Sequence, residues 1–190
     1  IKRGVYAAAL SVLNNDYSLN INATINHAEF VIKKGLHGVF FFGSTGQSQL
    51  ISNSEKKDFI SKIAGHKLRK SFYLGTGSNS LKDNIDLIKY SMEYGFQNFL
   101  IMPPAYYKGN TDEGVYNFYS TLILEIPKIK IILYNFEKLS GYKFSADAVK
   151  KLVASFPNNI IGCKDSGYNL FENLKIPNFM VFPGSEAKLL

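Results

Sequence analysis

Lys164 is the residue of this 190-residue chain whose type and position point most directly to chemistry. It ends the apolar run Ile160–Lys164, which has the composition of a buried strand. An ammonium at such a place is costly unless it is paired or neutral, and a neutral amine is a nucleophile toward ketones. A lysine that pairs with Asp165 or reaches solvent from a strand end would fit the same residues, so Lys164 alone does not establish a function.

Tyr134 and the segment Gly43–Ser48 supply two further groups that ketone chemistry needs. Tyr134 ends the preceding apolar run, where a phenol could transfer protons, although one of twelve tyrosines is by itself more simply a core residue. Gly43–Ser48 reads Gly-Ser-Thr-Gly-Gln-Ser, and its hydroxyls and backbone N–H groups suit an anion. Because it lacks the lysine of a nucleotide-binding P-loop, a small carboxylate fits better than a phosphate. An amine, a phenol and an anion-binding loop together describe Schiff-base chemistry on a 2-oxo acid.

The elements that would position these residues alternate along the chain. Seven short apolar runs predict parallel strands buried on both faces, and capped amphipathic segments between them predict helices. The predicted strands are Val5–Leu10, Gly38–Phe42, Phe72–Thr76, Phe99–Met102, Ile129–Tyr134, Ile160–Lys164 and Phe179–Phe182. The predicted helices are Ala23–Lys34, Asn53–Ala64, Leu81–Tyr94, Asp112–Ile126 and Ala146–Phe156.

Such alternation predicts a parallel α/β fold, either doubly wound or a (β/α)8 TIM barrel. A barrel needs eight strands and typically about 250 residues. We therefore expect residues 1–190 to form a single barrel domain truncated after the seventh strand, with the last strand and helices missing.

The composition excludes several other classes of protein. The net charge of +7 comes mainly from scattered lysines, and the 22 basic residues include only two arginines, so we expect no nucleic-acid partner. No apolar stretch approaches the roughly 20 residues of a membrane span. The single cysteine, Cys163, is expected in the core, and His27, His37 and His66 lack a carboxylate cluster at metal spacing, so we expect no metal. We expect a cytoplasmic enzyme without cofactor.

From Gly4 to its end the chain resembles the dihydrodipicolinate synthase / N-acetylneuraminate lyase family of class I, lysine-dependent aldolases. Three ordered motifs carry the resemblance: the family's G-[ST]-T-G-E loop, its Y-N-x-P-x-x-[ST]-G segment and its G-x-K-[DE]-[ST] strand. They are matched by Gly43–Gly46, by Tyr134-Asn135 with Gly141, and by Gly162-x-Lys164-Asp165-Ser166. Gly184-Ser185 also matches a G-[SD] pair after the seventh strand.

The resemblance implies a (β/α)8 barrel, commonly a homotetramer or otherwise a dimer, that acts on pyruvate and an aldehyde. It implies Lys164 as the Schiff-base lysine and Tyr134 as the proton-relay tyrosine. Tyr107 matches a tyrosine that in many members enters the neighbouring subunit's site. The resemblance also implies that Ser44 and Thr45 hold the substrate carboxylate and that Gly184 lies beside the pyruvyl group. Ser44 would in addition link the proton relay.

Departures from the family pattern narrow the expected substrate. Gln47 replaces the usual Glu, and Glu137 stands where Pro is usual. Leu139 stands where dihydrodipicolinate synthases carry an arginine for the acceptor's carboxylate, and an apolar side chain cannot make that forked pair. An aldolase or lyase of a 2-keto-3-deoxy sugar acid therefore fits better than dihydrodipicolinate synthase proper. A keto-deoxy sugar acid dehydratase and a catalytically idle paralogue that binds a 2-oxo acid are the alternatives.

Overall fold

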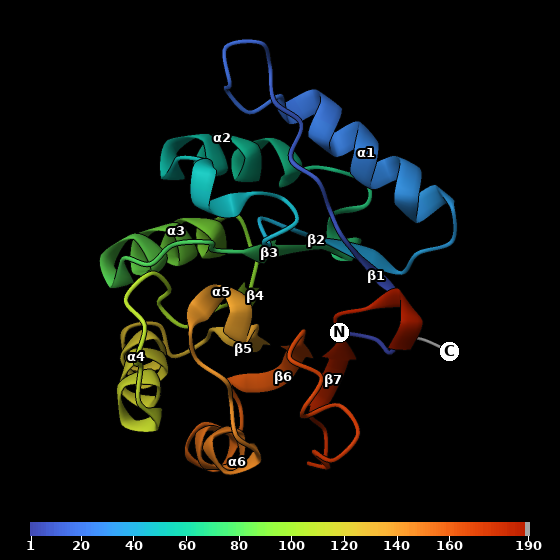
Figure 1. Ribbon diagram of the computed structural model, residues 1–190. Helices are drawn as coiled ribbons and strands as arrows, with labels where there is room; N and C mark the ends of the chain where they lie inside the picture. The colour runs from blue at the N-terminus through green and yellow to red at the C-terminus, as the bar shows by residue number, and fades with distance from the viewer. Residues whose placement is uncertain (189–190) are drawn as a thin grey trace. The chain divides into compact units, whose positions relative to one another are not determined.

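The computed structural model describes residues 1–188, which contain a seven-stranded sheet whose strand order follows the chain (Figure 1). The strands are β1 (Tyr6–Ala8), β2 (Gly38–Phe41), β3 (Phe72–Gly75), β4 (Asn98–Ile101), β5 (Lys130–Asn135), β6 (Ile160–Asp165) and β7 (Met180–Pro183). The pairs β1–β2, β2–β3, β5–β6 and β6–β7 are parallel. A doubly wound sheet reverses its strand order part-way. The observed order therefore excludes that alternative and confirms the barrel class, here through the seventh strand.

The connecting segments are helical at the five places predicted. The α-helices of residues 1–188 are α1 (Ile21–Lys33), α2 (Asn53–Ile63), α3 (Leu81–Glu93), α4 (Asp112–Glu125), α5 (Glu137–Ser140) and α6 (Ala146–Ser155). Three short 3-10 helices are η1 (Ser48–Leu50), η2 (Arg69–Ser71) and η3 (Glu186–Lys188). Helix α1 begins two residues before its predicted start because the Asn20 side chain accepts the N–H of Ala23 at 2.9 Å and caps it. The single turn of α5 was not predicted.

The described residues form two compact units, and each is considered by itself. The first unit comprises Ile1–Ser78 and Lys82–Phe99, and the second comprises Asn79–Leu81 and the residues from Leu100 onward. In the first unit, the ring of Phe41 packs edge-to-face on Phe59 and Phe72 at centroid distances of 4.7 and 5.2 Å. In the second unit, Ile131–Leu133 of β5 are fully buried, as a strand covered on both faces must be.

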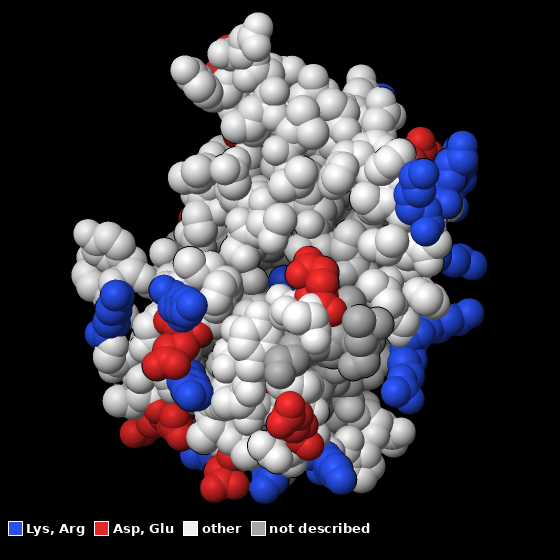
Figure 2. All heavy atoms as spheres, turned by 45° about the vertical axis from the view of Figure 1, so that its right-hand side comes forward, with Lys and Arg blue, Asp and Glu red and all other residues white. Residues whose placement is uncertain are grey.

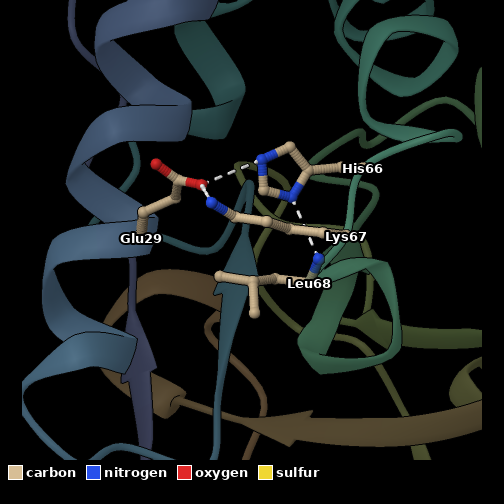
Figure 3. Close-up of polar contacts among 4 residues, drawn as sticks. All are labelled: Glu29, His66, Lys67 and Leu68. Carbon is tan, nitrogen blue, oxygen red and sulfur yellow. Dashed lines mark hydrogen bonds and ion pairs between the residues drawn. The ribbon is translucent and has the colours of Figure 1, made fainter.

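A polar cluster ties α1 to the segment that leads into β3 (Figure 3). Glu29 on α1 accepts from His66 Nε2 and pairs with Lys67 Nζ, both at 3.2 Å. His66 Nδ1 accepts the N–H of Leu68 at 3.2 Å, which assigns the ring proton to Nε2. The imidazole also stacks on Phe72, the first residue of β3, at 5.1 Å. The cluster therefore fixes the N-terminal end of a strand, away from the ends where barrel sites form.

The positive charge is spread over the surface. On the face drawn in Figure 2, Lys and Arg side chains form separate groups with uncharged surface between them, and several of these groups adjoin carboxylates. Exposed ion pairs such as Lys82–Asp86, with Nζ and Oδ1 2.9 Å apart, contribute little stability. None of the helices in the described part of the chain is long and apolar enough to cross a membrane.

Candidate active site

Lys164 and Tyr134 lie side by side at the carboxyl ends of β6 and β5. The two residues are direct partners in the parallel register, so their side chains leave the sheet on the same face. The Lys164 Nζ lies 4.5 Å from the centroid of the Tyr134 ring. Tyr134 is 4% exposed, whereas Lys164 is half-buried, so the amine keeps access that the ring does not. The structure thus brings together the predicted nucleophile and the predicted proton carrier.

The opposite face of β6 is closed. Cys163 and Asp165 flank Lys164 and are both fully buried, in agreement with the predicted core position of the cysteine. Burial, and next the nearby Asp165 carboxylate, raises the pKa of the Cys163 thiol far above its usual range. A thiol that resists ionisation is a poor nucleophile, so Cys163 is not a candidate nucleophile and Lys164 stays the predicted one.

Gly184 lies at the exit of β7, beside the end of β6. Its N–H donates to the carbonyl oxygen of Asp165 at 3.0 Å, and a Cβ at this position would overlap the Ser166 side chain. The hydroxyl of Tyr168 also donates to the Gly184 carbonyl at 3.4 Å. The carboxyl ends of β6 and β7 are therefore hydrogen-bonded to each other at the position where the sequence predicts a substrate contact. The close approach of Ser166 favours glycine at position 184.

Tyr107 occupies the loop after β4, behind the rigid Pro103-Pro104 pair. It is 82% exposed, and its ring packs edge-to-face on the equally exposed Tyr106 at 5.1 Å. Tyr106 has a φ of 78°, a left-handed conformation that is uncommon for a residue other than glycine. Entry of Tyr107 into a neighbouring subunit's site stays a prediction.

Ser44 and Thr45 belong to the first unit, in the loop between β2 and η1. The Ser44 carbonyl accepts the N–H of Gln47 at 3.0 Å, which closes the turn. On the β1 side, the Ser11 hydroxyl donates to the Gly46 carbonyl at 2.6 Å. Ser44 is half-buried and Thr45 is exposed, so this braced loop lies at the surface of the first unit.

A buried charged residue that sequence reasoning missed lies beside the exits of β2 and β3. Lys56 on α2 is only 2% exposed, and its Nζ donates to the Thr76 carbonyl at 2.9 Å. Its ammonium also lies 6.0 Å from the Phe42 ring centroid, at the exit of β2. A lysine on a polar helix looks like a solvated side chain in the sequence, and the burial arises from the tertiary fold.

The loop that follows Tyr134 contains the two further departures from the family pattern. Glu137 is the first residue of α5, a position where proline and other residues start a helix equally well, so the exchange leaves the helical turn intact. Leu139 is 43% exposed on the same turn, and Gly141 ends it at a φ of 70°. The turn therefore presents an apolar side chain to solvent beside the β5 exit.

Comparison with known proteins identifies the family. A sequence model of the dihydrodipicolinate synthetase family matches residues 2–190. The chain belongs to this family. Membership confirms the predicted resemblance.

Individual family members show how far the likeness extends. An uncharacterised DapA-like lyase of Thermococcus onnurineus is 30% identical over 99% of this chain and 66% of its own length. A 4-hydroxy-tetrahydrodipicolinate synthase of Legionella pneumophila is 35% identical over 86% of this chain and 55% of its own length. The chain thus spans between about half and two thirds of the length of these relatives.

Solved structures of family members share the fold. Dihydrodipicolinate synthase from Agrobacterium tumefaciens superimposes with a TM-score of 0.82 at 29% identity, over 88% of this chain and 60% of that one. The 2-keto 3-deoxygluconate aldolase from Picrophilus torridus gives 0.85 at 25% identity, over 97% and 68%. The family therefore includes members whose names describe both kinds of activity considered above.

Proposed function

We propose that this chain forms the Schiff-base centre of a cofactor-independent pyruvate aldolase or lyase. The observation that carries the proposal is the register pairing of Lys164 with Tyr134, which holds an accessible amine 4.5 Å from the centroid of a phenol ring at the carboxyl ends of two strands. Barrel enzymes build their sites at these ends.

Lys164 Nζ would attack the C2 ketone of pyruvate and form a carbinolamine, which loses water to give an iminium ion. The iminium draws electrons from the C3–H bond, and loss of that proton gives an enamine. The enamine carbon adds to an aldehyde, whose oxygen takes up a proton, and hydrolysis of the new iminium restores the amine. In the reverse direction a longer 2-oxo acid is cleaved. The Tyr134 phenol beside Lys164 would carry protons at the carbinolamine and at the acceptor oxygen.

The remaining predicted residues would bind and orient the 2-oxo acid. Ser44 and Thr45 offer hydroxyls and backbone N–H groups to the carboxylate, and Ser44 with Tyr107 would extend the proton relay from Tyr134. Gly184 would lie beside the pyruvyl group, at the exit of β7 next to the end of β6. Holding the reacting atoms in one geometry supplies a large part of the acceleration in such reactions.

Leu139 favours a sugar-acid substrate over aspartate semialdehyde. An exposed apolar side chain on α5 cannot pair with a carboxylate, whereas hydroxylated substrates need no cation there. We therefore propose a 2-keto-3-deoxy sugar acid as the substrate class, with pyruvate as the ketone product or donor.

A second candidate function is 4-hydroxy-tetrahydrodipicolinate synthase. The observation that favours it is the name of relatives that are up to 35% identical to the chain. The two functions differ in the aldehyde that reacts with the pyruvate enamine. Pyruvate release from 2-keto-3-deoxygluconate supports the first, and consumption of aspartate semialdehyde supports the second. Loss of water without cleavage of the sugar acid would indicate the dehydratase.

The decisive experiment is reduction of the pyruvate adduct. The protein is incubated with pyruvate and borohydride, and peptide mass spectrometry locates the reduced adduct. We expect it on Lys164 and expect Lys164→Arg to abolish it, whereas Lys130→Arg, at the other end of β5, leaves it unchanged. Absence of any adduct on Lys164 would refute the Schiff-base proposal and leave the idle, ligand-binding paralogue.

The proposal extends to the setting of the site. We propose that residues 1–190 belong to one barrel domain and that the protein acts as a homo-oligomer, a tetramer or a dimer, in the cytoplasm. The 82% exposure of Tyr107 supports the oligomer, because a relay tyrosine needs a second subunit to enclose it. Sedimentation of the wild-type protein and of Tyr107→Phe gives the assembly, and a monomeric protein with full activity would contradict it.

A further inference from the structure

A buried polar network lies directly behind the Lys164–Tyr134 pair. Asp165 is fully buried, and its carboxylate accepts four hydrogen bonds. Its Oδ1 accepts from Asn135 Nδ2 at 2.7 Å and from the Gly167 N–H at 3.2 Å. Its Oδ2 accepts from the N–H groups of Leu170 and Phe171 at 2.7 and 3.0 Å. A buried carboxylate with this many donors is held in a single orientation.

The Asn135 side chain is equally constrained. Its Nδ2 donates to Asp165 and also to Asn169 Oδ1 at 2.8 Å, and its Oδ1 accepts the N–H of Phe144 at 3.1 Å. Since a carboxylate can only accept, the amide orientation is fixed by chemistry. Asn169 completes the network by donating to the Phe144 carbonyl at 2.8 Å. All side-chain groups of Asn135 are therefore used.

Asn135 and Asp165 are register partners that immediately follow the pair Tyr134 and Lys164. Alternation along a strand sends the first pair to one face of the sheet and the second pair to the other. The bond between Asn135 and Asp165 thus joins β5 to β6, which lie side by side in Figure 1, one residue beyond the proposed reacting groups. A shift of either strand would separate both pairs together.

The register between β5 and β6 is not uniform along the two strands. Ile131 pairs with Ile160, but the next residue, Ile132, pairs with Gly162, so the register shifts by one between the two strands. A slip of one residue exchanges the two faces of a strand. The bond between Asn135 and Asp165 follows this shift and ties the two strands where Tyr134 stands opposite Lys164. The same carboxylate also holds the turn that begins at Leu170.

We infer that Asn135 and Asp165 are positioning residues that hold the Lys164 amine against Tyr134 for formation of the Schiff base. The inference rests on the proposed function, because it concerns the rate at which Lys164 reacts with a ketone. Neither side chain touches the amine in this arrangement; each acts through the strand that carries its neighbour. Misplacement of a reacting group by about 1 Å can lower a rate by about 100-fold.

The test compares variants of the network by single-turnover trapping of pyruvate with borohydride. We expect Asp165→Asn and Asn135→Ser to lower the trapping rate at saturating pyruvate by about 10- to 100-fold, with a much smaller change in the pyruvate concentration at half-saturation. Asp165→Glu keeps the carboxylate and should recover part of the rate. Asn169→Ala is the matched control, because it removes two bonds of the same network without touching the β5–β6 bridge. It should lower the melting temperature and leave the trapping rate within about threefold.

The outcomes separate this inference from the proposed function. Wild-type trapping on Lys164 together with unchanged rates in folded Asp165→Asn and Asn135→Ser would overturn the inference alone. Equal rate losses in Asn169→Ala and Asn135→Ser would also overturn it, because the network would then be a stabilising element without a positioning role. If Asp165→Asn does not fold, the trapping rates of Asn135→Ser and Asp165→Glu test the inference in its place. No trapping in the wild-type protein would refute the proposed function instead.

Discussion

Lys56 offers a prediction whose magnitude follows from the structure. Its side chain is 2% exposed on α2, and its Nζ donates to the Thr76 carbonyl at 2.9 Å. Burial lowers the pKa of Lys56 from 10.5 to about 8, although the charges of Asp83 and Glu55 oppose the shift. The perturbation is Lys56→Met, which keeps the length of the side chain and removes its charge.

The sign of the pH dependence follows from proton binding. Below pH 8 both the folded and the unfolded chain carry the Lys56 proton, and the folded protein bears the cost of burying the ammonium. Between about pH 8 and 10.5 the folded state releases the proton first, so the free energy of unfolding rises with pH. Integrated from pH 7 to 9.5, this rise amounts to about 2 kcal/mol for the wild-type protein, at 1.36 kcal/mol per pKa unit, and is absent from Lys56→Met.

Urea unfolding at pH 7 and at pH 9.5 gives the free energy of unfolding of the wild type and of Lys56→Met. The difference between the two proteins is compared at the two pH values, because the titration of other groups cancels in it. At pH 7 the variant should be as stable as the wild type or up to about 2 kcal/mol more stable, because relief of the buried charge outweighs the lost bond to Thr76. Lys62→Met, exposed on the same helix, is the control and should show no pH-dependent difference. Parallel stability curves for the wild type and Lys56→Met would refute the reasoning that the ammonium is desolvated.

Three further substitutions test packing and hydrogen bonds. A Cβ in Gly75→Ala would overlap the Phe42 carbonyl oxygen, so its melting transition should report a loss of about 1–3 kcal/mol. Tyr142→Phe removes the 2.7 Å bond to Asp112 and should cost about 1 kcal/mol in urea unfolding at neutral pH. His66→Ala removes both imidazole hydrogen bonds and the stack on β3, and calorimetry should show a loss of about 1–2 kcal/mol.

Each of these has a matched control. Gly65→Ala meets open space and should be neutral, so equal losses at both glycines would contradict the packing argument. Tyr17→Phe, at a residue 84% exposed, should leave stability unchanged, and a cost as large as that of Tyr142→Phe would argue against the bond. Lys67→Ala removes only an exposed ion pair and should change stability by less than about 0.5 kcal/mol. A larger loss than in His66→Ala would show that the ion pair, rather than the imidazole, holds the cluster.

The strands and most helices could be predicted from the sequence because their signals are local. Continuous apolar runs such as Ile129–Tyr134 are typical of strands covered on both faces. Helix caps are local too: Ser145 caps α6 by accepting the N–H of Ala148 at 3.0 Å. The positions of Lys164 and Tyr134 at strand ends were predicted for the same reason. Their exact opposition was not, because the register shift at Ile131 and Ile132 depends on tertiary packing.

The polar network behind the site left a signal that periodicity does not reveal. Asn135 and Asp165 look like the first loop residues after two apolar runs, yet both are the last residues of strands and both are fully buried. What marks them is their equal offset, one residue after Tyr134 and one after Lys164. Two polar residues that complement one another as donor and acceptor, at matching positions on adjacent parallel strands, indicate a bridge between the strands.

Burial alone would select the wrong lysine as the nucleophile. Lys56 is the more deeply buried of the two, and its pKa of about 8 is the kind of value that activated amines have. Its Nζ is nevertheless occupied by the Thr76 carbonyl and closed off from a ketone in solution. Lys164 is half-buried beside Tyr134, so its amine keeps access to solvent and has the proposed proton carrier as its neighbour. Borohydride trapping should therefore label Lys164 and leave Lys56 unmodified, and a pyruvate adduct on Lys56 would show that access does not decide between them.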